Sequence, residues 1–173
     1  AVYDQSGPSP KRPGDPTRKD GSPYVVGKLA VEAVVEGRGG VTARLANIYG
    51  PMMKPGTVIS DIMAQIPGRH ALRIRDPRPV RDFLWVGDAA AALAAFAFGA
   101  GAGTYNVGTG IGTSIGDLAR HALAAANEQD RQIQEGQSDV HTTSVVLDIS
   151  ATIADFGWYP TITLQDGLRR MLR

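Results

Sequence analysis

Residues 41–51 read VTARLANIYGP, and this stretch decides the fold. Its β-branched and apolar residues stop at Gly50-Pro51, a pair that ends regular structure, so it predicts a buried strand over Val41–Tyr49. The segment before it predicts a helix over Tyr24–Glu36, because apolar residues recur along one side at Val26, Leu29, Ala30, Ala33 and Val34. A helix that leads into a buried strand is typical of α/β proteins.

Strands and helices keep alternating after this stretch. The predicted strands are Leu72–Ile74, Phe83–Val86, Thr104–Val107 and Val145–Leu147. The predicted helices are Thr57–Ile66, one from an N-cap at Asp88 to Phe98, one from Ser114 to Asn127, Ser150–Phe156 and a last one capped by Thr163. Two segments are predicted as loops: residues 4–23, with five prolines, and the polar stretch Glu128–Ser144, which we expect to be mobile. The fold class is therefore α/β.

Composition excludes several classes of protein. The chain has 173 residues, 43% of them hydrophobic, and no cysteine, so a disulfide-stapled module and a cysteine nucleophile are both excluded. A net charge of +1 gives no basic surface for nucleic acid, and no apolar run is long enough for a membrane span. We expect a cytoplasmic protein without a metal site, because the three histidines share no ligand spacing. Trp85 and Trp158 are expected in the core.

Tyr24 and Lys28 are the strongest candidates for chemistry. Four residues apart on a helix, their side chains lie on the same side. An ammonium group near a phenol favours the phenolate, which would let Tyr24 exchange a proton with a substrate hydroxyl. Taken alone the pair is weak, since Lys28 could equally form a surface ion pair with Glu32 one turn further on.

Six ordered motifs resemble the extended short-chain dehydrogenase/reductase family, which contains the epimerases and dehydratases of nucleotide sugars. Residues 1–4 resemble the end of its "VYG" strand, residues 23–28 its "PYxxxK" helix and residues 43–51 its "LRxxNVYGP" strand. Residues 81–88 are similar to "RDFIHVDD" and residues 104–108 to "YNVG". Residues 148–150 and the segment 157–169 resemble "DxSK", "GWxP" and "GLR".

The resemblance implies a role for each matching residue. Tyr24 would be the catalytic acid/base, Lys28 would assist it and bind the ribose of NAD, with NADP as the other option, and the backbone at Leu45 would line the nicotinamide. Asn47 would bind the sugar or diphosphate of a nucleotide sugar, unless it only satisfies a local turn. Arg81 would clamp the diphosphate, or else form a surface ion pair. Thr57 and Val58 would begin the substrate-binding helix.

The chain also departs from the family pattern. No strand with a following "GxxGxxG" turn begins it, so residues 1–173 are expected to be the C-terminal portion of the fold, without its dinucleotide-binding half. Within that portion, residues 4–23 would form a loop, residues 24–50 the catalytic helix and next strand, and residues 51–173 mainly a small α/β substrate lobe beside a remnant of the Rossmann-like parallel sheet. Gln137-Ser138-Asp139 stand where a second diphosphate-binding arginine is usual.

Three functions stay open. The first is an NAD(P)-dependent epimerase or reductase of a nucleotide sugar; a 4,6-dehydratase is less favoured because Ala1, not glutamate, precedes Val2. The second is a noncatalytic protein, or one that depends on a partner chain for the dinucleotide half. The third is a hydroxysteroid-type dehydrogenase, which needs Tyr24 and Lys28 but neither Asn47 nor Arg81. A homodimer through the "PYxxxK" helix is a further expectation.

Overall fold

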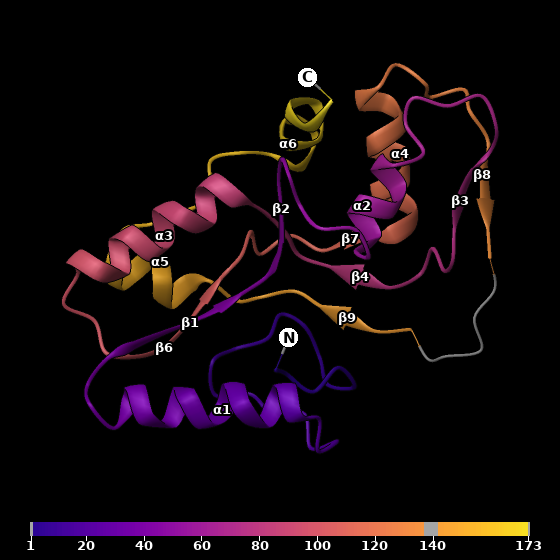
Figure 1. Ribbon diagram of the computed structural model, residues 1–173. Coiled ribbons are helices and arrows are strands. Elements are labelled where there is room, and N and C mark those ends of the chain that lie inside the picture. Colours follow the sequence, from indigo (N-terminus) through magenta and orange to yellow (C-terminus); the bar gives the residue numbers. More distant parts are fainter. Residues whose placement is uncertain (1, 137–141, 173) are drawn as a thin grey trace.

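A computed structural model describes residues 2–136 and 142–172. Two parallel strands, β1 (Val41–Leu45) and β6 (Gly103–Val107), form its central pair. Helix α1 (Pro23–Glu36) lies on one side of this pair, and α3 (Val86–Phe98) and α5 (Ser150–Phe156) lie on the other (Figure 1). Parallel strands covered by helices on both faces are the Rossmann-like α/β arrangement that the sequence predicts.

A second lobe continues from β1. Its short strands are β2 (Asn47–Tyr49), β3 (Leu72–Ile74), β4 (Val80–Arg81), β5 (Phe83–Trp85), β7 (Thr113–Ser114), β8 (Ile133–Glu135) and β9 (Ser144–Val145). The pairs β2–β5 and β3–β8 are parallel, and β4 lies between antiparallel β7 and parallel β9. The helices of the lobe are α2 (Val58–Met63), α4 (Ile115–Ala125) and α6 (Leu164–Met171). A buried core joins these helices to β2, β3 and β5.

The strand predicted over Val41–Tyr49 is two strands with different partners. β1 pairs with β6 and β2 pairs with β5, and the change of partner falls at Ala46. The Ala46 amide donates to Val107, and the next amide, that of Asn47, donates to Asp82. A single strand was the wrong prediction because apolar composition does not reveal where a strand exchanges its neighbour.

Asp88 is not the N-cap of α3. The helix begins at Val86, and the N-cap residue Trp85 makes no side-chain capping bond. Asp88 lies buried in the first turn, where its carboxylate accepts hydrogen bonds from the amide and hydroxyl of Thr161 and from the amide of Ile162. Its carboxylate therefore ties the segment before α6 to α3. An aspartate close to a helix start predicts an N-cap, but the Asp88 side chain binds a distant part of the chain instead of the helix amides.

The predicted loop Glu128–Ser144 contains a strand. Residues Ile133–Glu135 form β8, which pairs with β3, so this part of the prediction is wrong. Residues 137–141, and with them Gln137-Ser138-Asp139 and His141, lie outside the described residues. Two other elements end earlier than expected: α2 ends at Met63 and not at Ile66, and β9 ends at Val145 and not at Leu147.

Other local predictions are confirmed. Ser114 and Thr163 cap α4 and α6, each accepting from the backbone amide three residues on. Both tryptophans are buried. Residues 4–22 contain no helix or named strand, and Tyr3, from the expected strand end, forms an isolated bridge with Thr17.

Helix α6 packs against the core through a close backbone contact. A Cβ atom added at Gly167 would lie 2.1 Å from the Tyr49 hydroxyl, so only glycine fits there. Tyr49 is 1% exposed, and its burial raises the pKa of the phenol. This contact joins the "GLR" and "NIYGP" segments and fixes β2, which carries residues of the candidate site, against the end of the chain.

Candidate functional site

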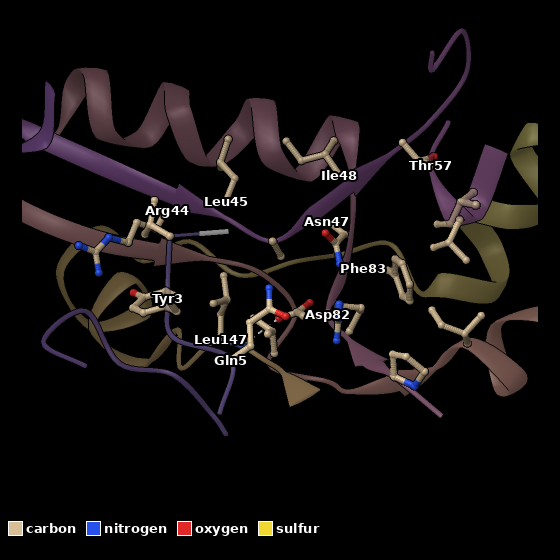
Figure 2. Close-up of a pocket in the computed structure, with 18 of the residues that line it drawn as sticks. Tyr3, Gln5, Arg44, Leu45, Asn47, Ile48, Thr57, Asp82, Phe83 and Leu147 are labelled. Carbon is tan, nitrogen blue, oxygen red and sulfur yellow. Dashed lines mark hydrogen bonds between the residues drawn. The ribbon is translucent and has the colours of Figure 1, made fainter. Parts of the chain in front are cut away.

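One cavity of about 810 Å³ collects the predicted site residues. It lies between α1, the β1–β2 segment, α2 and the wall formed by β4. The seven predicted cofactor- and substrate-binding residues all line it: Tyr24, Lys28, Leu45, Asn47, Thr57, Val58 and Arg81. They are spread over nearly 60 positions of the chain, and the fold brings them to one place, as Figure 2 shows for several of them.

Tyr24 and Lys28 stand on the first turns of α1, which begins with Pro23 in its first turn, a position that suits proline. Tyr24 is 62% exposed, and the Lys28 Nζ atom lies 5.8 Å from the centroid of its ring. Neither side chain forms a hydrogen bond or ion pair with another described residue. The alternative pairing of Lys28 with Glu32 does not occur, because Glu32 pairs with Arg44. Both groups are therefore available to a ligand.

A buried ion pair sets the position of α1. Arg44 on β1 holds both Glu32 carboxylate oxygens, the shortest contact being 2.7 Å from Nη2 to Oε2. Its Nη1 atom donates to the Pro13 carbonyl over 2.9 Å, and its guanidinium stacks 4.8 Å from the centroid of the Tyr3 ring. One arginine thus links the helix, the strand and the proline-rich loop. The sequence analysis missed this group, since its spacing of twelve residues matches no local pattern.

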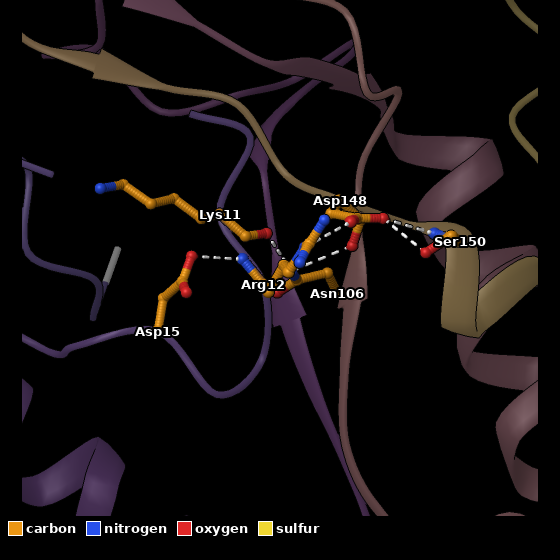
Figure 3. A network of polar contacts seen from close by, with 6 residues as sticks. All are labelled: Lys11, Arg12, Asp15, Asn106, Asp148 and Ser150. Carbon is orange, nitrogen blue, oxygen red and sulfur yellow. Dashed lines mark hydrogen bonds and ion pairs between the residues drawn. The ribbon is translucent and has the colours of Figure 1, made fainter. Parts of the chain in front are cut away.

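The proline-rich loop is fastened to the sheet by main-chain contacts (Figure 3). The Lys11 amide donates to Val146 over 2.7 Å, and the Lys11 carbonyl accepts from the Asp148 amide over 2.8 Å and from Asn106 Nδ2 over 2.7 Å. The Arg12 Nε atom lies 3.3 Å from Asp148 Oδ2. The loop that leads to α1 is therefore held at a fixed place beside β6 and β9.

Two residues that hold the loop belong to sequence motifs: Asp148 to the "DxS" segment and Asn106 to the "YNVG" segment. Asp148 accepts from the hydroxyl and amide of Ser150, and these hydrogen bonds, with Arg12, lower the pKa of its carboxyl. Asn106 is 1% exposed, and its Oδ1 atom accepts from the Tyr3 hydroxyl over 2.5 Å. The "YNVG" and "DxS" segments thus act on the site through the loop, a role that the sequence analysis did not assign.

Arg81 lines the cavity with its guanidinium already oriented. Nη1 donates to the carbonyls of Val80 and Thr143 over 2.8 and 2.9 Å, and Nη2 donates to Thr143 Oγ1 over 2.7 Å. Of the five N–H groups of an arginine, the Nε–H and one Nη2–H are left for a ligand. Burial lowers the pKa of Arg81, and no carboxylate among residues 2–136 and 142–172 pairs with it, so the surface ion pair is not found.

Asp82, next to Arg81, is held by the protein itself. It is 1% exposed and accepts from the amide and hydroxyl of Thr109 over 2.8 and 2.6 Å, from the Gly110 amide over 3.1 Å and, more weakly, from the Leu147 amide over 3.4 Å. Burial raises the pKa of its carboxyl. A Cβ at Gly108 would come within 2.5 Å of the carboxylate, so the "YNVG" glycine permits this packing.

The remaining predicted residues differ in how free they are. Asn47 is exposed at the cavity, and no hydrogen bond ties its side chain to another described residue, so the local-turn alternative is not found. The Thr57 hydroxyl is occupied in the cap of α2, where it accepts from the Ser60 amide, and Val58 packs partly against the core. The Leu45 side chain packs toward α3, away from Asn47 and Asp82 (Figure 2), which leaves its backbone on the cavity side.

Residues 2–136 and 142–172 contain neither a candidate metal site nor a candidate membrane span. Among them, histidine, aspartate and glutamate side chains do not gather in any group of three that could hold a metal ion. No helix in this part of the chain is both long and apolar enough to cross a membrane.

Comparison with known proteins adds to this geometry. Residues 1–108 match the family model described as the NAD dependent epimerase/dehydratase family. A UDP-glucose 4-epimerase of Mycolicibacterium smegmatis is 28% identical over 174 aligned positions, which cover 91% of this chain and 56% of that protein. A putative UDP-glucose 4-epimerase of Methanocaldococcus jannaschii is 26% identical over 75% of this chain and 43% of its own length.

Solved structures of similar proteins share the fold. UDP-glucose 4-epimerase of Thermotoga maritima, solved with UDP-glucose, superposes with a TM-score of 0.86 at 22% identity, covering 99% of this chain and 59% of that one. RMD of Pseudomonas aeruginosa, solved with NADPH, gives a TM-score of 0.82 at 26% identity, covering 99% of this chain and 62% of that one. The chain thus spans about half the length of the curated relatives that it matches.

Proposed function

Because this chain belongs to the NAD dependent epimerase/dehydratase family, we propose that it forms the substrate-binding and acid/base part of an epimerase of nucleotide-diphosphate sugars. The observation that carries the proposal is that one cavity receives a phenol, an amine, an amide and an oriented guanidinium from α1, β2 and β4. A nucleotide sugar offers hydroxyl groups to the phenol and the amide and a diphosphate to the guanidinium, which leaves the amine for a cofactor.

Tyr24 is the acid/base in this proposal. As a phenolate, Tyr24 takes the proton from a sugar hydroxyl while the sugar carbon becomes a carbonyl, and the phenol so formed returns that proton when the carbonyl is reduced. Lys28 lies beside the ring at 5.8 Å and stabilises the phenolate that forms after Tyr24 gives up its own proton. Because Glu32 is paired with Arg44, it does not neutralise the Lys28 ammonium group.

At the end of the cavity formed by α1, two donors without a partner among the described residues fit a nicotinamide cofactor. The Lys28 ammonium and the Tyr24 hydroxyl have no partner among the described residues, and ribose hydroxyls would provide partners for both. The backbone at Leu45 lines the same end. NAD or NADP, when bound, supplies the hydride acceptor and donor that an epimerase needs. This chain's residues would bind its ribose and handle the sugar proton.

The other end of the cavity would hold the nucleotide sugar. Arg81 offers two unused N–H groups on one edge, a geometry suited to a phosphoryl oxygen pair. Asn47 offers both a donor and an acceptor that are not engaged with a described residue. These two groups favour a nucleotide sugar over a steroid, which has no charged group for Arg81 to bind.

The chain covers only part of the length of its relatives, and this matters for what the whole protein contains. We propose that residues 1–173 are the C-terminal portion of an extended short-chain dehydrogenase/reductase fold, as the coverage of 43% and 56% of two relatives suggests. The dinucleotide-binding half would then come from further sequence or from a partner chain. A homodimer and a cytoplasmic location stay predictions.

Substitution of Tyr24 in the full-length protein tests the proposal. We expect Tyr24→Phe to lower kcat with UDP-glucose by about a hundredfold to ten-thousandfold, the usual share of a general acid/base, while NAD binding measured by calorimetry is retained. Tyr159→Phe is the matched control, because Tyr159 is 63% exposed and does not line the cavity. Turnover in Tyr24→Phe equal to that of Tyr159→Phe contradicts the proposal, and so does turnover of a steroid but of no nucleotide sugar.

A further inference from the structure

A third arginine of the cavity, Arg75, has no partner among the described residues. Arg75 follows directly after β3, and its exposed side chain forms no hydrogen bond or ion pair with any residue among 2–136 and 142–172. The other two cavity arginines are engaged, Arg44 by Glu32 and Arg81 by Thr143. No carboxylate among residues 2–136 and 142–172 therefore neutralises the charge of Arg75.

The adjacent carboxylate is already occupied. Asp76 also lines the cavity, but its Oδ1 and Oδ2 atoms face Arg78, each at 3.0 Å from a guanidinium nitrogen. The Arg78 amide donates to the same Oδ1 over 3.0 Å. A carboxylate held from both oxygens in this way is a poor partner for a second guanidinium. Arg75 is thus left facing the cavity while its neighbours form their own pair.

The main chain around Arg75 is fixed on both sides. The Ile74 carbonyl accepts from the Gly136 amide over 2.9 Å, and a Cβ at Gly136 would lie 2.5 Å from the Arg75 carbonyl oxygen. Further on, the Pro77 carbonyl accepts from the first turn of α4 over 3.0 Å. Because the main chain is already fixed, binding of a ligand by Arg75 would order its side chain only and not the backbone.

We propose that Arg75 binds one phosphoryl group of the ligand's diphosphate while Arg81 binds the other, an inference that rests on the proposed function. The two arginines belong to one wall of the cavity, since Asp76 and Pro79 between them line it as well. A diphosphate in a nucleotide sugar carries one negative charge on each phosphoryl group, and each guanidinium offers a planar pair of donors. The site thereby gains a second diphosphate contact from a part of the chain that carries no family motif.

Binding to the full-length protein tests this role. We expect Arg75→Gln to weaken UDP-glucose binding, measured by calorimetry, by about tenfold, the loss of one charge-assisted hydrogen-bonded contact. The factor should be equal for dTDP-glucose, because the two ligands share the diphosphate and differ in the nucleoside. Arg75→Lys should recover part of the loss. Arg73→Gln is the matched control, since Arg73 is also exposed, lies two residues away and does not line the cavity.

Each outcome has a distinct meaning. Wild-type affinity in Arg75→Gln, or a loss for only one of the two nucleotides, overturns the inference but leaves the proposed function to the Tyr24 test. A loss equal to that of Arg73→Gln overturns it too, since the effect would then be one of overall charge. Failure of the unsubstituted protein to bind either nucleotide sugar removes both the inference and the proposed function.

Discussion

The substrate lobe and helix α1 are held in place by different forces. The lobe has a continuous apolar core in which Leu72, Leu118 and Leu168 are 0% exposed. In α1, a helix of 14 residues, only Val25 and Glu32 are buried, while apolar residues such as Val31 remain 61% exposed. The lobe is stabilised by burial of apolar area, whereas the helix that carries Tyr24 is positioned by one ion pair and a fastened loop. Three measurements of stability can separate these two modes.

The largest effect is expected in the lobe. Leu118→Ala removes a fully buried side chain from α4 and should lower the free energy of unfolding by about 4 kcal/mol, within the range for large-to-small core substitutions. Val31→Ala on α1 should change it by less than about 0.5 kcal/mol, because that side chain is largely exposed. Urea unfolding measures both. Equal losses in the two variants would mean that the two regions are packed alike.

Breaking the ion pair of α1 should have the next largest effect. Glu32→Ala leaves the largely buried Arg44 guanidinium without its carboxylate and should cost about 3 kcal/mol. Its remaining contacts with Pro13 and Tyr3 keep the cost at the lower end of the range for such pairs. A double-mutant cycle with Arg44→Ala measures the coupling. A coupling energy below about 0.5 kcal/mol would show that α1 is positioned by something else.

The smallest effect should come from the loop fastening, and it should depend on pH. The pKa of Asp148 lies below its ordinary value of 3.8, so its carboxylate contributes stability above that pH and loses the contribution as the pH falls through and below it. Asp148→Asn should cost about 1 kcal/mol at pH 7. The difference from the unsubstituted protein should shrink as the pH falls below 3.8. Asp130→Asn is the control, because Asp130 is exposed and has no partner among the described residues.

The sequence identified the residues of the candidate site better than it identified the contacts that hold this site together. Tyr24, Lys28, Asn47 and Arg81 were found because a motif lists them in order, and the cavity brings them together. The Glu32–Arg44 pair was not found, since partners from a helix and a strand leave no periodic signal. Arg75 was not singled out, because its lack of a partner among the described residues is a property of the folded chain.

The fold was predicted where local patterns decide it. Hydrophobic periodicity and caps identified most helices, such as those capped by Ser114 and Thr163. The errors fall where a distant partner decides instead. β8 is a strand because β3 offers it a neighbour, and the strand over Val41–Tyr49 divides because β5 and β6 offer it two. The polar composition of β8 gave no sign of a strand, and the mainly apolar composition of Val41–Tyr49 gave no sign of a division.

Asp82 shows how an activity screen could mislead. An acidic residue at the cavity wall, with a raised pKa and a place beside Arg81, has the usual features of a catalytic acid. Yet its carboxylate is fully engaged by Thr109, Gly110 and Leu147, and replacing it would loosen the loop after β6. A survey that measured turnover alone would take a loss of activity in an Asp82 variant as evidence that Asp82 is catalytic. Measured together with abundance and unfolding, the same variant would be recorded as a folding defect.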